Sequence, residues 1–297
     1  MKPAFDLAAW SSRRLAQVEQ ALSQAVTGDA PAGLGDAMRY AVLDGGKRLR
    51  PLLVLAACEA VGGNEAAALR AACATELIHA YSLVHDDMPC MDNDVLRRGK
   101  PTVHVKFGQA QALLAGDALQ ALAFELLTPD DETISAAMQA RLCRLLARAA
   151  GHEGMAGGQA IDLASVGLAL TEPQLREMHR RKTGALLEGS VMMGAMCGEA
   201  TAPAADALRV YGAAVGLAFQ VVDDILDVTA DSATLGKTAG KDAAQDKPTF
   251  VSLLGLERSR AYARDLLARA HAALERSGLA NTQSLRALAD MVVSRDS

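Results

Sequence analysis

Apolar residues recur at helical spacing along almost the whole chain. Within residues 7–26, Leu15, Val18, Leu22 and Val26 keep to one face, which predicts an amphipathic helix. Alternation with a period of two residues is not sustained, so no strand is expected. We therefore predict an all-α protein, with further helices over residues 51–61, 66–88, 109–127, 132–151, 172–198, 204–228 and 257–277.

Glycines and prolines separate these predicted helices, but no linker rich in Ser, Gly or Pro divides the chain. We therefore expect residues 1–297 to form a single domain. The least helical stretch, residues 229–248, is rich in Thr, Gly, Lys and Asp and is predicted to be a mobile loop.

Composition narrows both fold and function. Of the 297 residues, 51% are hydrophobic and only 3% are aromatic, a mix that favours helix over sheet. The net charge of −5 argues against a nucleic-acid binder, which would present a basic face. Basic residues nevertheless gather at residues 47–50, 97–98 and 180–182, which indicates a small anionic ligand.

The cysteines and the N-terminus predict a soluble, cytoplasmic protein. The five cysteines form no CxxC pair and lie in apolar surroundings, so we expect reduced thiols in the core. They are Cys58, Cys73, Cys90, Cys143 and Cys197. The N-terminus has no signal-peptide pattern, and no apolar run approaches the roughly 18 residues of a membrane span.

One of two acidic clusters occupies residues 223–227. Asp223 and Asp227 are four residues apart, so they stand one helical turn from each other, with Asp224 beside them. Such carboxylates repel one another unless a positive charge lies between them. The alternative is an ordinary solvated helix face, but apolar neighbours such as Val222 and Ile225 argue against full exposure.

The other acidic cluster occupies residues 86–92. Asp86 and Asp92 would lie far apart around an ideal helix, but Pro89 between them can bend the chain and return Asp92 to the side of Asp86. The alternative is a helix end with acids in a loop. Two acidic clusters on apolar helices together indicate a protein site that binds Mg2+ together with a phosphorylated substrate.

A glycine pair precedes the basic residues of the first third of the chain. Lys47, Arg48 and Arg50 follow Gly45–Gly46 at the entry to a predicted helix, where an anion is favoured and a cation is not. This unfavourable placement supports ligand binding over a helix entry without a ligand.

Further polar candidates lie beside the first acidic cluster. His79 precedes Asp86 by seven residues and shares its helix face, although a lone histidine there is more often structural. Arg97 and Arg98 follow the cluster. They either form ordinary ion pairs or grip phosphate oxygens bridged to the same metal ions.

A glycine interrupts the predicted helix over residues 172–198. Gly184 follows Lys182 and Thr183 and weakens the helix there, which could free a backbone carbonyl. Gln220 places an amide on the side of the second acidic cluster.

Four further polar residues are harder to assign. Gln159 and Asp162 are predicted to form a buried hydrogen-bonded pair. Lys237 and Lys247, in the expected loop, are either solvated or close onto a bound diphosphate.

Five blocks of the sequence, in order, resemble the trans-isoprenyl diphosphate synthases. The similarity is strongest to the bacterial farnesyl diphosphate synthases, whose first acidic motif carries two extra residues, here Pro89 and Cys90. The blocks are GGKRLRP (45–51), HAYSLVHDDMPCMDND with LRRGKPTVH (79–104), GGQAIDL (157–163), RRKTGAL (180–186) and FQVVDDILDVTADSATLGK (219–237).

The resemblance implies an all-helical bundle around a deep central cavity, usually in a homodimer, and about three Mg2+ ions with substrate bound. Asp86, Asp92 and Asp223 would be the main Mg2+ ligands, supported by Asp87, Asp224 and Asp227. Lys47, Arg50, His79 and Arg98 would hold isopentenyl diphosphate. Arg97, Lys182, Thr183, Gln220 and Lys237 would hold the allylic diphosphate or face the developing cation.

The resemblance also implies the reaction, in which isopentenyl diphosphate attacks an allylic cation and extends the chain. Tyr81 and Ser82, five and four residues before Asp86, would form the cavity floor. The bulk of Tyr81 favours farnesyl diphosphate, with geranyl and geranylgeranyl diphosphate as alternatives. Asn93 departs from the family's frequent aspartate, and the terminal residues 295–297 are less basic than in some relatives.

Two functions of other classes remain. A class I terpene cyclase would share the helical fold but would have little use for a second diphosphate site at Lys47, Arg50 and His79. A non-catalytic subunit of a heteromeric synthase would be expected to lose an acidic motif, and both are present.

Overall fold

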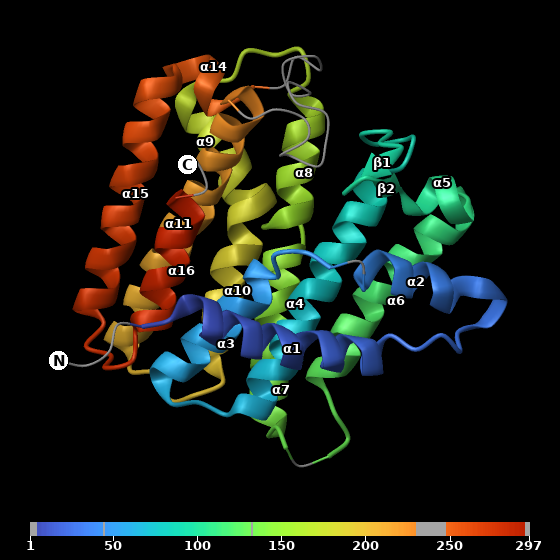
Figure 1. Cartoon of the computed structure of the whole chain (residues 1–297), viewed down its shortest axis with the longest axis horizontal. Coiled ribbons are helices and arrows are strands. Elements are labelled where there is room, and N and C mark those ends of the chain that lie inside the picture. Colours follow the sequence, from blue (N-terminus) through green and yellow to red (C-terminus); the bar gives the residue numbers. More distant parts are fainter. Residues whose placement is uncertain (1–4, 44, 132, 230–247, 295–297) are drawn as a thin grey trace.

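The computed structural model describes residues 5–43, 45–131, 133–229 and 248–294 (Figure 1). Their helices pack side by side into a bundle that confirms the predicted all-α class. The helices are α1 (Leu7–Ala25), α2 (Leu34–Val42), α3 (Leu49–Val61), α4 (Glu65–Asp86), α5 (Val103–Phe107), α6 (Gln109–Leu127), α7 (Ala136–Ala150), α8 (Met155–Ala164), α9 (Glu172–His179), α10 (Ala185–Met196), α11 (Ala202–Thr229), α14 (Phe250–Leu254), α15 (Leu256–Arg276) and α16 (Gln283–Val293).

Sequence signals account for the longest helices. Asn64 precedes α4 and accepts a hydrogen bond from the backbone N–H of Ala67, as an N-cap does. The predicted helix over 172–198 corresponds to α9 and α10, which are joined without a gap by a π-helical turn, η2 (Arg180–Gly184). The short helices α2, α5, α8, α14 and α16 were not predicted.

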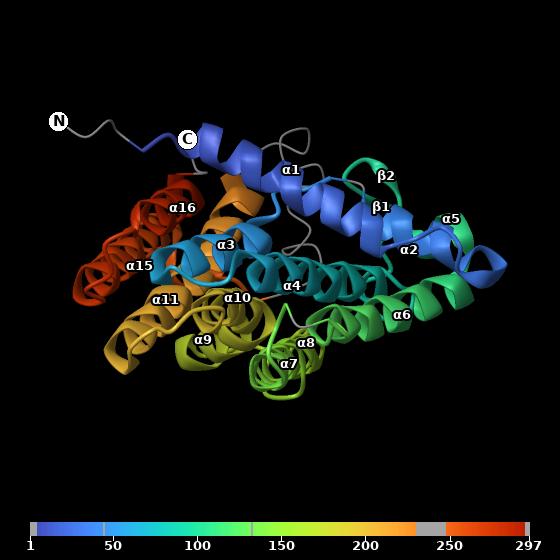
Figure 2. The same cartoon turned by 90° about the horizontal axis from the view of Figure 1, so that it is seen from below.

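The apolar core has two parts that share the central helices. One part lies among α1, α2, α4, α6 and α7, and the other among α9, α11, α14, α15 and α16. Helices α1, α3 and α10 contribute to both parts. Figure 2 shows α3, α4 and α10 between α6 on one side and α15 on the other. A row of buried alanines on α4 lets its neighbours approach closely (Ala67, Ala68, Ala71, Ala72 and Ala74).

The strand-free expectation fails at one place. β1 (Leu96–Arg97) pairs antiparallel with β2 (Lys100–Pro101), with Arg97 opposite Lys100. Between them Arg98 has φ 51° and Gly99 φ 75°, the left-handed pair that a tight hairpin turn requires. Two predicted site residues belong to this hairpin: Arg97 lies in β1 and Arg98 in its turn.

No apolar run of about 18 residues was expected, but by length and composition alone two helices are apolar enough to cross a membrane. They are Gln109–Leu127 and Ala202–Thr229, each of which contains an apolar 18-residue stretch with at most two charged residues. In α11, 61% of that stretch is buried against the rest of the protein, which explains its apolar character. In α6 33% of that stretch is buried, and Leu113 and Leu114 are among its exposed residues.

The cysteines follow the core expectation only in part. All five are free thiols; Cys58, Cys73 and Cys197 are buried and Cys143 is half-buried. Cys90 is exposed, because it lies in the turn that follows α4 and not in a helix.

Candidate active site

The first acidic cluster folds back on itself. Helix α4 ends at Asp86, and the backbone N–H of Asp92 then donates to the Asp86 carbonyl over 2.9 Å. The expected kink was therefore wrong, and the alternative of a helix end with acids in a loop is correct, although the turn still returns the backbone of Asp92 to Asp86. Burial is the main cause that raises the pKa of Asp86 to about 6. The positive charge of Lys182 opposes this shift, and the negative charge of Asp92 adds to it.

The aspartate between them has a different partner. Asp87 is 3% exposed and forms a bidentate pair with Arg97, whose Nε lies 2.9 Å from Oδ2 and whose Nη2 lies 2.6 Å from Oδ1. Both side chains line a small cavity of about 40 Å³ between α2, α4 and the β1–β2 hairpin. The structure thus brings Asp87 and Arg97 together as an ion pair. Of the two alternatives for Arg97, this supports the ordinary ion pair over a contact with phosphate oxygens.

The second acidic cluster lies on the last turns of α11. Asp223 is half-buried, whereas Asp224 and Asp227 are 2% and 4% exposed. Asp227 Oδ1 is buried and finds no hydrogen-bond partner among the described residues. A buried carboxylate oxygen of this kind is costly without a cation or a water molecule, so it suits a metal site.

Three of the four predicted isopentenyl diphosphate residues come together. Burial lowers the pKa of His79 well below its usual value, and the charges of Arg50 and then Arg98 lower it further. The imidazole is therefore neutral at neutral pH and can act as a hydrogen-bond donor. Burial also lowers the pKa of Arg50, and the charge of Asp223 opposes this, so Arg50 links α3 electrostatically to the end of α11.

The fourth, Lys47, follows a glycine turn that contacts Arg98. Arg98 donates a short hydrogen bond to the carbonyl of Gly45. A Cβ on Gly46, which has φ 135°, would lie 2.8 Å from Arg98 Nη2. This close approach and the positive φ both favour glycine at position 46, and the next residue along the turn, Lys47, is exposed.

The π-helical turn η2 supplies the opposite wall. Lys182 Nζ lies 2.5 Å from Asp162 Oδ2 on α8, and its charge also lowers the pKa of Asp86. Lys182 is therefore within electrostatic range of the first acidic cluster, although the two are 96 positions apart (182 − 86). Thr183 Oγ1 donates to Gln220 Oε1 over 3.0 Å, which ties η2 to α11.

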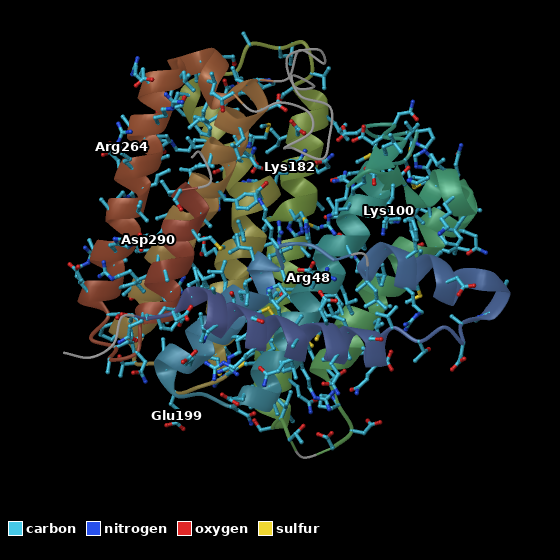
Figure 3. The ribbon with its side chains drawn as sticks, viewed as in Figure 1. Arg48, Lys100, Lys182, Glu199, Arg264 and Asp290 are labelled. Atoms are coloured by element: carbon cyan, nitrogen blue, oxygen red, sulfur yellow. The ribbon has the colours of Figure 1, made fainter. Side chains whose placement is uncertain are left out.

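Figure 3 labels Lys182 beside α8, and Arg48 where α1, α3 and α4 meet. Arg48 thus leaves the basic cluster and turns into the core.

The expected pair of Gln159 with Asp162 was wrong: Asp162 binds Lys182, and both amide atoms of Gln159 are buried without a hydrogen-bond partner among the described residues. Sequence reasoning did not identify His179, Glu76 or Glu19, whose partners are distant along the chain.

The predicted floor residues lie on the α6 side of α4. The ring of Tyr81 meets that of His85 edge-on, with centroids 5.6 Å apart, and the Gln120 side chain lies near its hydroxyl. Ser82 Oγ donates to the His79 carbonyl over 2.9 Å. Lys237, Lys247 and residues 295–297 lie outside the described residues.

The acidic residues fit magnesium only together with a substrate. Among the described residues, no three His, Cys, Asp or Glu side chains lie close enough to hold an ion unaided. Carboxylate oxygens on two facing walls nevertheless match an ion that takes a few carboxylates and completes its shell with water and phosphate.

The comparisons with known proteins agree with this arrangement. A family model described as "Polyprenyl synthetase" matches residues 31–287. The chain is 46% identical to a geranylgeranyl pyrophosphate synthase of Catharanthus roseus over 98% of this chain and 82% of the relative.

Two solved structures are also similar. A farnesyl/geranylfarnesyl diphosphate (FPP/GFPP) synthase of Zymomonas mobilis superposes with a TM-score of 0.86 at 42% identity, covering 97% of this chain and 99% of that one. A geranyltransferase of Helicobacter pylori, complexed with magnesium and isoprenyl diphosphate, gives 0.84 at 33% identity over 99% and 98% of the two chains.

Proposed function

Since this chain belongs to the polyprenyl synthetase family and is a prenyltransferase, we propose that it condenses isopentenyl diphosphate with dimethylallyl and then geranyl diphosphate to give farnesyl diphosphate. The observation that carries the proposal is that each acidic cluster interacts with a basic residue from a different part of the bundle. Lys182 acts on Asp86, and Arg50 on Asp223, across helices far apart in sequence.

The proposed roles divide along these walls. Asp86, Asp92 and Asp223 would be the principal magnesium ligands, with Asp227 close by. Magnesium, when bound as about three ions with the allylic diphosphate, would neutralise that group and make it a better leaving group.

The residues of the chain bind and orient the two substrates. Lys47, Arg50, His79 and Arg98 would hold the diphosphate of isopentenyl diphosphate, with the neutral imidazole as a hydrogen-bond donor. Lys182 would hold the allylic diphosphate, while the oxygens of Thr183 and Gln220 would face the developing allylic cation. Arg97 and Lys237 are proposed to assist this diphosphate.

The remaining steps need little from side chains. The apolar faces of α4 and α11 would exclude water, which would otherwise capture the cation. The proton lost after condensation would pass to the released diphosphate, so no side-chain base is required.

The fifteen-carbon product is proposed from the position of Tyr81. Tyr81 lies five residues before Asp86, where a bulky side chain would stop chain growth, and its ring packs edge-on against that of His85. Geranylgeranyl diphosphate is the second candidate, because the Catharanthus relative is named as a synthase of that product. The Zymomonas structure, named as an FPP/GFPP synthase, supports farnesyl and longer products alike.

We also propose that the protein is a cytoplasmic homodimer of single-domain chains. Helix α6 exposes two neighbouring leucines, Leu113 and Leu114, which are 47% and 51% exposed. An apolar face of this kind would suit contact with a second copy. Five free thiols suit a reducing compartment.

The test is incubation of the purified protein with labelled isopentenyl diphosphate, dimethylallyl diphosphate and Mg2+, followed by dephosphorylation and sizing of the products. Labelled farnesol is the expected result. Labelled geranylgeraniol would replace the product assignment, and an unlabelled hydrocarbon would indicate a terpene cyclase. No incorporation would indicate a non-catalytic subunit.

A further inference from the structure

Asp224 is the most enclosed of the aspartates on α11, and protein donors reach both of its oxygens. Its side chain is 2% exposed. The backbone N–H of Phe250 donates to Oδ2 over 2.7 Å, and Gln220 Nε2 donates to Oδ1 over 2.9 Å. Hydrogen bonds to a buried charged group are among the stronger ones in proteins.

The bond to Phe250 has a particular consequence. Phe250 is the first residue of α14, and a helix leaves the N–H of its first residue without a partner within the helix. Asp224 supplies that partner from α11, 26 positions earlier. The start of α14 is therefore held directly by the second acidic cluster.

The bond to Gln220 continues into the opposite wall. Because the Gln220 NH2 group faces Asp224, its amide oxygen is left to accept from Thr183 Oγ1, at 3.0 Å. The Thr183 hydroxyl hydrogen is engaged in that bond, so the lone pairs of its oxygen remain to face a ligand. One carboxylate thus determines the orientation of two polar side chains.

A second route joins the same parts. The fully buried ring of Phe250 lies 5.4 Å from that of His179, which directly precedes η2. His179 Nε2 is also 3.9 Å from Asp224 Oδ2. Asp224, the start of α14 and the π-helical turn therefore form one packed and hydrogen-bonded unit.

We propose that Asp224 is a positioning residue, which supports the metal site by orienting Gln220 and Thr183 and by anchoring α14, and not by coordinating the ion. Asp223, half-buried on the same turn, keeps the ligand role. The kinetic part of this inference rests on the proposed function, since it uses the roles given there to Gln220 and Thr183. The structural part does not.

The experiment compares three variants of the full chain. Asp224→Asn leaves one acceptor for the two donors and removes its charge, so the Phe250 N–H either loses its bond or keeps only a weaker bond to a neutral amide oxygen. Asp223→Asn is the matched control at the neighbouring position. Gln220→Glu combined with Asp224→Asn reverses one bond, because the introduced amide can then donate to the introduced carboxylate while the amide oxygen accepts from Phe250.

Two quantities are measured. The first is hydrogen exchange of the Phe250 amide in the metal-free protein, with the Ala67 amide as internal reference, because Ala67 lies on another helix, α4, and donates to the Asn64 side chain. The second is kcat together with the Mg2+ concentration that gives half-maximal rate. Circular dichroism establishes that each variant is folded.

For Asp224→Asn we expect Phe250 exchange to accelerate about tenfold or more and kcat to fall about tenfold, since a hydrogen bond to a charged group is lost. Its Mg2+ requirement should stay within about twofold of the parent, by the same reasoning that no ligand is removed. Asp223→Asn should raise the Mg2+ requirement and leave Phe250 exchange unchanged. The double variant should restore slow Phe250 exchange.

The inference is overturned if Asp224→Asn raises the Mg2+ requirement as much as Asp223→Asn does, or if Phe250 exchange is the same in parent and variant. It is also overturned if the double variant exchanges as fast as Asp224→Asn. Should the parent show no synthase activity, the proposed function fails alone, and the exchange measurements still decide the role of Asp224.

Discussion

Arg48 Nη1 lies 2.7 Å from Glu76 Oε1, and the two side chains are only 2% and 4% exposed. Arg48 also donates to Glu19 on α1 and to the Val42 carbonyl. Its backbone has φ 46°, the left-handed conformation that reverses the chain into α3. The buried pair therefore fixes the segment from which Lys47 extends.

Glu76→Gln should lower the free energy of unfolding by roughly 3 kcal/mol, because it leaves the buried Arg48 guanidinium with less compensating charge. The measurement is urea-induced unfolding. The matched control is Glu65→Gln on the same helix, whose ion pair with Arg14 is exposed and should contribute less than about 1 kcal/mol. Equal losses in the two variants would contradict a special role for the buried pair.

Asp86→Ala and Asp223→Ala should each reduce turnover about a hundredfold or more, because a principal metal ligand is lost while the leaving group stays the same. Turnover is measured at saturating Mg2+, with circular dichroism to establish folding. Asp206→Ala serves as control, since Asp206 is an exposed acid of α11 paired only locally with Arg209. Near-normal turnover in the first two variants would remove the metal assignment.

Tyr81→Ala should lengthen the product, because the phenol that rests on His85 and Gln120 is removed from the expected floor. Tyr81→Phe retains the bulk and loses only the hydroxyl, so its products should match those of the parent. Chromatography of dephosphorylated products compares the three proteins. An identical chain length in all of them would show that the floor lies elsewhere.

Glu177 should contribute stability that depends on pH. Its hydrogen bonds and charge interactions with Arg180 and Arg181 lower its pKa from 4.5 to about 2. The contribution is therefore complete above pH 4.5, where the unfolded chain is also ionised, and is lost as the pH falls toward 2.

Glu177→Gln should thus reduce stability at about pH 7 by at most about 1 kcal/mol, because the pair is largely exposed. The difference from the parent should shrink between about pH 4.5 and the lowest pH at which both proteins fold, and in about 1 M salt. Thermal unfolding across pH measures it. A difference that stays constant with pH would mean that the charge of Glu177 is not its source.

Sequence periodicity predicted the helices with long apolar faces, and α6 was predicted at its observed bounds, 109–127. It failed for α8, whose two glycines lower helix propensity. Tertiary packing explains that glycine content, because a Cβ on Gly158 would lie 2.0 Å from the backbone nitrogen of Lys182. Packing of this kind is not visible along the chain.

The candidate site divides in the same way. Residue type and local spacing identified the acidic clusters and predicted the loosened turn at Lys182–Gly184, which is a π-helical turn in the structure. They did not identify which side chains pair across the bundle. Asp162 with Lys182, 20 positions apart, and Asp224 with Phe250, 26 positions apart, depend on how helices pack.

The described residues hold no ready-made cluster of three metal-ligating side chains, and this has a thermodynamic consequence. If neither wall retains an ion alone, magnesium and the diphosphate must strengthen each other's binding, and by linkage the two enhancements are equal. The substrate-free enzyme would then not bind Mg2+ at cellular concentrations, and the ions would bind and dissociate with the diphosphate in each turnover.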